Sequence, residues 1–174
     1  MFGEAGVIIG QILSFVAVLT GFISFQMKSA KGVLIFQIIT AFVFAAHYLL
    51  IGATTAAGLN LVGAVKCICY YIRNKLQSKS PVVPIFFTTL IIITSLLTWD
   101  GWYSIFIMAG LAINSIGFAL SNVQTIRRLN LIKSPLCLIY NICVLSTGGI
   151  IFETASIISS VIGLARNNKP AHVE

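Results

Sequence analysis

The amino-acid sequence predicts an all-α integral membrane protein, with seven transmembrane helices that form two parallel three-helix bundles joined by a linker helix. Three observations lead to this fold class: the composition, the lengths of the apolar stretches and the placement of the basic residues. The 174 residues are 58% hydrophobic and 9% charged, with mean hydropathy +1.01. A soluble domain carries about 25% charged residues. Folding in water would therefore leave large apolar patches uncovered, whereas a bilayer would solvate them.

Seven stretches are apolar over the length that a spanning helix needs, about 20 residues with roughly 17–25 usual. The sixth stretch is shorter than the others, and a start near Leu129 is an alternative for it. The predicted spans are 5–26, 32–51, 54–72, 82–99, 102–120, 134–147 and 150–165.

The basic residues fall in every second gap between these spans. The gaps after the first, third, fifth and seventh spans hold all of the 11 Lys and Arg except Lys66, namely Lys28, Lys31, Arg73, Lys75, Lys79, Arg127, Arg128, Lys133, Arg166 and Lys169. Cytoplasmic loops of membrane proteins are enriched in Lys and Arg, and interfacial tryptophans flank the membrane. The alternation therefore predicts an N-out, C-in orientation, with Trp99 and Trp102 at the outer interface.

The net charge of +7 does not indicate a nucleic-acid-binding protein, because no basic run with interleaved aromatic residues occurs. We expect the basic loops to face anionic membrane lipid instead. The four cysteines lie inside apolar stretches and have no zinc-ligand spacing to His47 or His172. We expect no metal and no other cofactor.

The spans group as three, one and three. This grouping predicts a first three-helix bundle over 1–76, a linker helix over 77–99, a second bundle over 100–168 and a cytoplasmic tail over 169–174. A single helix between two triplets makes the triplets parallel, and parallel repeats are a known plan of membrane transporters. A shift of 93 residues places Arg73 and Asn74 on Arg166 and Asn167.

A family resemblance lies in four places: the segment HYLLIG at 47–52, Tyr140-Asn141, the segment STGG at 146–149, and Glu153. Through these residues the chain is most similar to the YgjV family of small bacterial inner-membrane proteins. In its three-one-three, N-out layout it also resembles the SWEET sugar-transporter superfamily, including bacterial SemiSWEETs and the PnuC vitamin-precursor transporters. The proline–glutamine motif of many SWEET-like proteins is absent. The resemblance implies a fold and a multi-pass location in the bacterial inner (plasma) membrane, and no substrate.

Ionisable side chains inside a membrane are costly, so each one is a candidate functional residue. Glu153 lies about one turn into the seventh span, where it would accept a proton or contact a cationic or hydroxylated solute. The alternative is an interfacial carboxylate that suits the helix N-terminus. Lys66 lies within the third span, and we expect its long stem to carry the ammonium to the headgroups. If Lys66 faces the bundle instead, it is a counter-ion for an anionic substrate or for Glu153.

Four polar residues are further candidates for contact with a substrate. His47 and Tyr140 lie 93 positions apart and would place a polar ring in each bundle at one depth. His47, with an unperturbed pKa near 6.5, fits either a gate or a structural hydrogen-bonded residue. Asn60 and Asn141 lie near the middle of spans three and six, and their amides suit hydroxyl or carbonyl groups of a solute. Hydrogen bonding between helices is the alternative for both.

Helical spacing gathers small and polar residues on one face of the third and of the seventh span. In SWEET-like proteins the third helix of each triplet lines the pathway, which implies that these faces contact the solute. The same residues would equally serve close helix packing. The two faces contain Asn60, Gly63, Cys67 and Tyr70, and Glu153, Ser156, Ser160 and Gly163.

We interpret the chain as a small-solute transporter or facilitator in which two parallel bundles rock around a midplane site. A non-transporting membrane receptor or accessory subunit with the same fold is the alternative, because no substrate signature is recognisable. We do not expect an enzyme, since no Ser–His, paired-Asp or H-E-x-x-H arrangement occurs. One pathway fits within a monomer of seven helices, and association into a homo-oligomer is compatible with the sequence.

Overall fold

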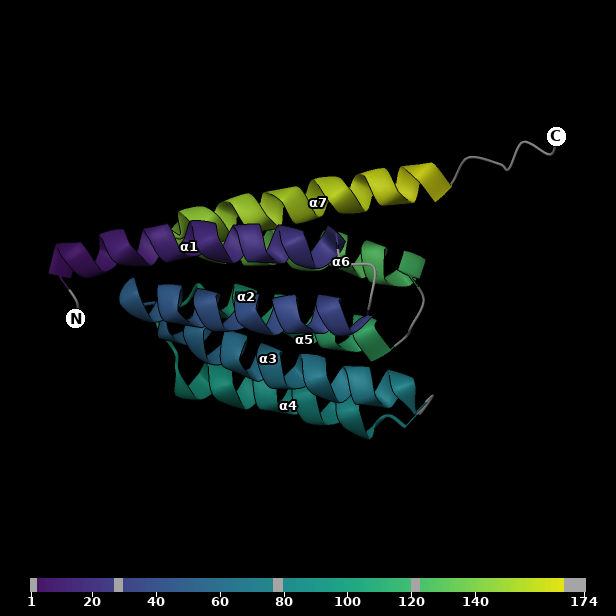
Figure 1. Cartoon of the computed structure of the whole chain (residues 1–174). Coiled ribbons are helices and arrows are strands. Elements are labelled where there is room, and N and C mark those ends of the chain that lie inside the picture. The colour runs from purple at the N-terminus through teal and green to yellow at the C-terminus, as the bar shows by residue number, and fades with distance from the viewer. Residues whose placement is uncertain (1–2, 27–29, 77–79, 120–122, 168–174) are drawn as a thin grey trace.

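In the computed structural model, all regular secondary structure of the described residues is α-helical (Figure 1). The structure describes residues 3–26, 30–76, 80–119 and 123–167. Within these ranges the helices are α1 Gly3–Gln26, α2 Ala30–Leu50, α3 Thr54–Lys75, α4 Val82–Leu97, α5 Ser104–Ala119, α6 Val123–Cys143 and α7 Thr147–Asn167. The prediction of an all-helical fold with seven helices is confirmed. Lys28, Lys79, Lys169, His172 and the tail predicted at 169–174 lie outside the described residues.

Helix α6 is the one element whose predicted bounds were wrong. The other six helices agree with the predicted spans to within three residues at each end. Helix α6 begins at Val123 rather than at residue 134. The reason is an amphipathic stripe at helical spacing that starts before the apolar stretch, and most of it packs inward: Arg127, Asn130, Ser134, Cys137 and Asn141. A search for apolar residues alone overlooks this polar half of the helix.

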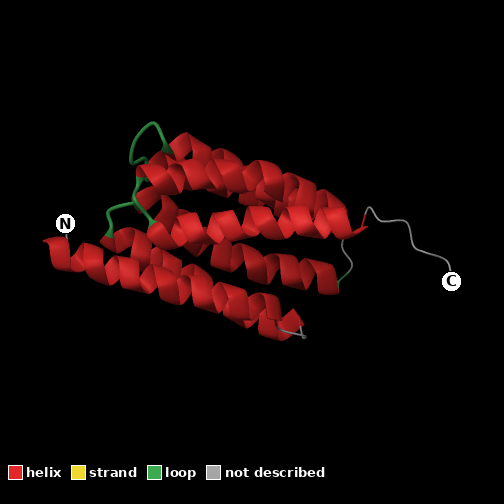
Figure 2. Ribbon diagram, turned by 90° about the horizontal axis from the view of Figure 1, so that it is seen from above, coloured by secondary structure: helices red, strands yellow, loops and turns green. Residues whose placement is uncertain are grey.

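Each helix packs against the next one in the sequence, and the first contacts the last (Figures 1 and 2). Helix α2 packs between α1 and α3, and α6 packs between α5 and α7. Helix α4 contacts α3 and α5, and α1 contacts α7. The approach of α1 to α7 depends on Gly148, because a Cβ at this position would lie 2.4 Å from the Cβ of Ser14.

The outer surface of the bundle is apolar. Large side chains such as Ile8, Leu19 and Leu97 are exposed on it. Within the described residues, three segments are long and apolar enough to cross a membrane: Gly3–Ile23 in α1, Thr54–Arg73 in α3 and Thr147–Ala165 in α7. Shorter apolar segments occupy Ile35–Leu50, Val82–Leu97 and Ser104–Ile116. A bilayer solvates such a surface, whereas in water it would drive association.

The α2–α3 and α6–α7 turns have the same geometry at positions 93 residues apart. Gly52 and Leu145 both adopt a positive φ, at 82° and 54°. The N–H groups of the next residues, Ala53 and Ser146, donate to the carbonyls five residues earlier, at 2.8 and 2.9 Å. This is the Schellman ending of a helix, which satisfies carbonyls that the helix leaves without partners.

Both turns lie at the same end of the bundle as the α4–α5 loop. His47 at the end of α2 bonds to Ser146 in the α6–α7 turn, and Asp100 in the α4–α5 loop bonds to Thr54 at the start of α3. We call this end, formed by residues 51–53, 98–103 and 144–146, the turn end.

At the turn end, α3 and α7 are capped by residues distant in the sequence. The carboxylate of Asp100 accepts from the first two N–H groups of α3, at 3.1 and 2.9 Å. The first two N–H groups of α7 donate to Gln11 Oε1 and Ser14 Oγ of α1, both at 3.2 Å. The first N–H groups of a helix have no partner within the helix, so these caps tie α3 to the α4–α5 loop and α7 to α1.

Leu145→Gly is expected to raise the melting temperature of the protein in detergent. The left-handed conformation costs a residue with a Cβ about 1–2 kcal/mol, and glycine avoids this cost. The Leu145 side chain is exposed, so its removal loses little packing in the bundle. Gly52→Ala at the equivalent turn position is the matched control and is expected to lower the melting temperature. An equal fall of the melting temperature in the two variants would contradict the left-handed conformation assigned to Leu145.

Asp100→Ala is expected to destabilise the protein by about 2 kcal/mol or more, and clearly more than Gln11→Ala. The first variant removes a charged cap, worth about 0.5–2 kcal/mol, and also the acceptor of the Tyr140 hydroxyl. Gln11 carries no charge, and its hydrogen bonds to Thr147 and Leu145 are exposed, so water can replace part of its bonding. Chemical unfolding in detergent micelles followed by circular dichroism would compare them, and a larger loss in Gln11→Ala would refute this ranking.

Candidate functional site

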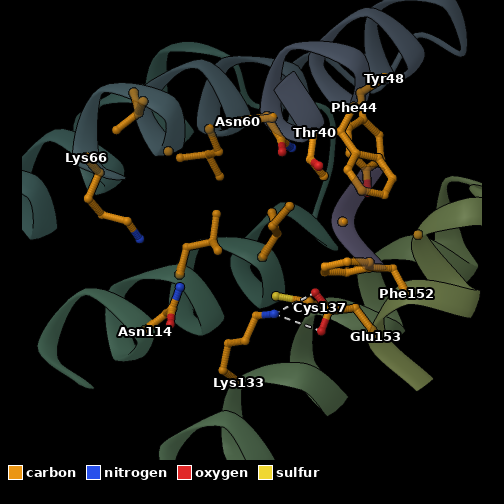
Figure 3. A pocket seen from close by; sticks show the side chains of 18 of the residues that line it. Thr40, Phe44, Tyr48, Asn60, Lys66, Asn114, Lys133, Cys137, Phe152 and Glu153 are labelled. Carbon is orange, nitrogen blue, oxygen red and sulfur yellow. Dashed lines mark hydrogen bonds and ion pairs between the residues drawn. The ribbon is translucent and has the colours of Figure 1, made fainter. Parts of the chain in front are cut away.

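A cavity of about 240 Å³ lies inside the bundle, and every helix contributes to its wall (Figure 3). It extends along the middle of α3, from Leu59 to Cys67. Its volume is far above the ~10–15 Å³ needed to hold one water molecule. Polar and aromatic side chains line it, among them Gln37, Thr40, Phe44, Tyr48, Asn60, Lys66, Asn114, Lys133, Asn141, Phe152 and Glu153.

The cavity has an aromatic end and a polar end. Phe44 stacks on Tyr48 with ring centroids 5.8 Å apart and meets the edge of Phe152 at 5.6 Å. These rings lie toward the turn end. Lys66 and Asn114 enter the cavity at its other end, from α3 and α5 (Figure 3).

An ion pair between Lys133 and Glu153 lies in the wall of the cavity. The ammonium donates to both carboxylate oxygens, at 2.7 and 2.8 Å. The two side chains are only 10% and 9% exposed. The assignment of Lys133 to a cytoplasmic loop was therefore wrong, because the helix that carries it begins a full ten residues earlier. Lys133, and not Lys66, is the counter-ion of Glu153.

Glu153 is a buried residue of the second turn of α7, since the helix begins at Thr147. The alternative prediction for Glu153, a water-exposed carboxylate in the first turn, is therefore wrong. Lys66 is 6% exposed and lines the cavity, so its stem does not carry the ammonium to the headgroups as we expected.

Asn141 and Asn60 both line the cavity, on α6 and α3. The side-chain oxygen of Asn141 accepts from the Tyr48 hydroxyl at 2.7 Å, and its amide nitrogen donates to the Cys137 carbonyl at 2.8 Å. Asn60 donates to the Ala56 carbonyl at 2.8 Å. Asn141 therefore joins α2 to α6, whereas Asn60 bonds only within its own helix in the contacts described.

His47 and Tyr140 are fully buried and lie beside the cavity-lining residues Tyr48 and Asn141, at the turn end. The Gly10 carbonyl can only accept, so Nδ1 of His47 donates to it at 2.7 Å. In the neutral ring Nε2 then accepts from Ser146 Oγ, also at 2.7 Å. Each ring bridges distant elements, and neither belongs to the cavity wall.

Tyr140 makes the corresponding bridge from α6. Its hydroxyl donates to Asp100 Oδ2 at 3.1 Å and accepts from the Ala56 N–H at 3.2 Å. The ring of Tyr140 also packs against Tyr103, with centroids 5.8 Å apart. His47 and Tyr140 thus close the bundle at the turn end.

Ser156 faces α6 rather than the cavity. The amide of Asn130 donates to Ser156 Oγ at 2.9 Å and to Ser160 Oγ at 2.7 Å. One turn further on, Arg127 donates to the Gly163 carbonyl at 2.9 Å. This part of the predicted polar face of α7 packs against another helix, whereas Glu153 on the same face reaches the cavity.

Many cavity-lining residues stand at positions 93 apart. The pairs are Gly21 and Asn114, Thr40 and Lys133, Phe44 and Cys137, Tyr48 and Asn141, Leu59 and Phe152, and Asn60 and Glu153. Tyr48 and Asn141, which bond to each other, are themselves one such pair. The charged pair Lys133–Glu153 therefore corresponds to neutral Thr40 and Asn60 on the other side of the cavity.

Sequence reasoning missed seven polar or aromatic residues of the wall: Gln37, Thr40, Phe44, Tyr48, Asn114, Lys133 and Phe152. The sequence held a signal for Lys133, because the shift of 93 places it on Thr40 as it places Glu153 on Asn60. Asn114 and the adjacent Ser115 sit in an otherwise apolar stretch, and nothing in the sequence there indicates which way Asn114 faces.

A helical bundle with an apolar exterior and a polar internal cavity is the architecture of a multi-pass membrane protein. The sequence model of the Imp-YgjV family, described as a bacterial inner membrane protein, matches residues 8–170. The chain therefore belongs to the Imp-YgjV family of bacterial inner membrane proteins. No curated protein and no solved structure matches it.

Glu153→Gln and Lys133→Met are each expected to destabilise the protein, by about 3–5 kcal/mol, because each leaves one buried charge without its partner. The double variant Lys133→Met/Glu153→Gln removes both charges and is expected to regain most of the loss. A double-mutant cycle on unfolding in detergent measures this coupling. Additive losses in the double variant would show that the pair does not act as a unit.

Proposed function

We propose that the protein is a small-solute transporter or facilitator, with the cavity as its solute site. The two halves, 1–76 and 100–168, act as parallel three-helix bundles, with α4 as the linker between them. The N-terminus faces outward and the C-terminus faces the cytoplasm. The observation that carries the proposal is the cavity itself, whose wall is built from paired positions of the two halves.

The 93-residue correspondence supports a repeat. It relates the two Schellman turns, with Gly52 and Leu145 at the same place. It also relates the capped starts of α3 and α7, and six pairs of cavity-lining positions, from 21 and 114 to 60 and 153. Transporters built from parallel repeats hold their solute near the membrane midplane, between the repeats. The cavity beside the middle of α3 agrees with such a position.

The closed turn end supports alternating access. Most of the described hydrogen bonds that join the two halves lie there, among them Tyr48 to Asn141, Ser146 to His47, and Thr147 to Gln11. One bond between the halves, from the Tyr70 hydroxyl to the Ser115 carbonyl, lies near the opposite end. Rocking of one bundle against the other would break the contacts at the turn end and open the cavity on the side where it is now closed. The described structure is then the state that is closed at the turn end.

The first experiment that tests this proposal measures ligand binding. The purified protein is heated in detergent with a library of sugars, nucleosides, vitamins, amino acids and organic acids, because a ligand of the folded state raises the melting temperature. A hit is expected to lose its effect in Asn60→Ala. The same hit should then enter proteoliposomes faster than it enters empty liposomes.

Cross-linking the turn end is expected to stop that flux while binding remains. Gln11→Cys/Thr147→Cys, in a protein whose four native cysteines are replaced by alanine, joins α1 to α7 through a short bifunctional thiol reagent. Flux should fall to the level of empty liposomes, because the cavity can no longer open at this end. Each single cysteine variant treated with the same reagent is the matched control. Unchanged flux in the cross-linked protein would refute alternating access at the turn end.

The alternative is a membrane receptor or accessory subunit that binds a solute without moving it. Ligand binding without flux in any orientation, together with a stoichiometric partner co-purified from native membranes, would favour this reading over transport.

A further inference from the structure

We propose that the solute is a small zwitterion, an amino acid with an apolar side chain, whose carboxylate binds Lys133 and whose ammonium binds Glu153. The inference rests on the proposed function, because it assigns the substrate class of the same cavity. Three observations carry it: the ion pair in the cavity wall, the bonding capacity that this pair retains, and the aromatic rings beside it.

The ion pair presents two opposite charges side by side to the cavity. Lys133 Nζ lies 2.7 and 2.8 Å from the two carboxylate oxygens of Glu153, and both residues line the cavity. A singly charged solute beside the pair is attracted by one charge and repelled by the other at a similar distance. A zwitterion that lies antiparallel to the pair is attracted by both. The pair therefore favours a solute that carries both charges over a simple anion or cation.

Both members of the pair retain bonding capacity. An ammonium has three donors, and a carboxylate has about four acceptor sites. In the described contacts Lys133 gives two donors to Glu153, and the carboxylate accepts these two bonds. One donor and about two acceptor sites thus remain for a solute. The solute binds while the pair stays intact, so neither buried charge loses its partner.

The aromatic end of the cavity lies beside the pair and suits the side chain of the solute. Phe152 directly precedes Glu153 on α7, and its ring contacts Phe44, which stacks on Tyr48. Figure 3 shows Phe152 and Glu153 on the same side of the cavity. Aromatic rings provide a large apolar surface, so an apolar side chain is favoured here.

The size of the cavity agrees with a solute as small as an amino acid. Its volume of about 240 Å³ lies below the ~300–1,000 Å³ of sites for drug-sized ligands.

The Lys133–Glu153 pair has no charged counterpart at the corresponding positions of the other half. Those positions hold Thr40 and Asn60, which are neutral. Lys66, the other charged residue among the described residues of the wall, lies at the far end of the cavity from the rings (Figure 3). A zwitterion with an apolar side chain therefore has one position in which its charges meet the pair and its side chain meets the rings.

Three compounds with one apolar body test the requirement for both charges: L-leucine, 4-methylpentanoate and 3-methylbutylamine, which are zwitterionic, anionic and cationic. The full-length protein in detergent is assayed at neutral pH by thermal shift and by titration calorimetry. L-leucine is expected to raise the melting temperature. It should bind about tenfold or more tightly than either singly charged compound, since each of these lacks one charged partner. L-phenylalanine, a second zwitterion, is expected to bind as well.

The double variant Lys133→Met/Glu153→Gln tests the assigned site. It removes both charges together, so no buried charge is left alone, and it should weaken L-leucine binding by about tenfold or more. Glu4→Gln/Lys75→Met is the matched control, because both residues are exposed and lie outside the described cavity wall. It is expected to bind L-leucine like the unchanged protein. Size-exclusion chromatography shows whether each variant is folded, and the comparison of compounds on the unchanged protein depends on neither variant.

Each outcome separates the solute class from the transport proposal. No binding of either zwitterion would overturn the inference, as would tighter binding of the anion or the cation than of L-leucine, and both results would leave transport of another solute standing. L-leucine binding that the folded double variant retains would overturn the assigned site. L-leucine binding that depends on the pair, without any flux in proteoliposomes, would support the zwitterion site and count against transport.

Discussion

Buried polar groups in an apolar bundle have no bulk water to bond with, so each must find its partner within the protein. In the described part of the chain every buried side-chain nitrogen and oxygen has a hydrogen-bond partner. This constraint accounts for the architecture of the turn end. Asp100 caps α3, Gln11 and Ser14 cap α7, and Tyr48 bonds to Asn141 across the bundle. The bonds that satisfy single polar groups are also the bonds that hold the helices together there.

The same constraint separates the two sides of the cavity. The Thr40 hydroxyl bonds to the Phe36 carbonyl of its own helix at 2.8 Å and to the Thr20 hydroxyl of α1 at 2.9 Å, and Asn60 bonds within α3. At the corresponding positions Lys133 and Glu153 bond to each other between α6 and α7. At these positions the second half is thus cross-linked by a charged pair, whereas the first half carries neutral hydrogen-bonding groups.

Helix existence followed from the sequence, because long apolar stretches separated by charged gaps leave few other arrangements. The start of α6 did not follow from apolarity. Residues 123–133 mix polar and apolar side chains, and their helical character lies in the spacing of Arg127, Asn130 and Ser134. The error had a consequence for the site, since it placed Lys133 in a cytoplasmic loop and left Lys66 as the candidate counter-ion of Glu153. A stripe of polar residues at helical spacing can indicate a buried helix face, just as an apolar stripe does. It does so when a neighbouring helix carries polar groups that can bond to it.

The sequence by itself determined the all-helical class, seven helices, the 93-residue correspondence and the candidates Glu153, Lys66, His47, Asn60 and Asn141. These depend on local composition and spacing, which the chain carries along its length. Only the tertiary structure decided which candidates meet. Glu153 pairs with Lys133 rather than Lys66, Ser156 packs on α6, and His47 closes the turn end instead of lining the cavity. The reason is physical: the direction of a side chain on a helix follows from its spacing, but its partner depends on the rotation and depth of the neighbouring helix, which packing decides.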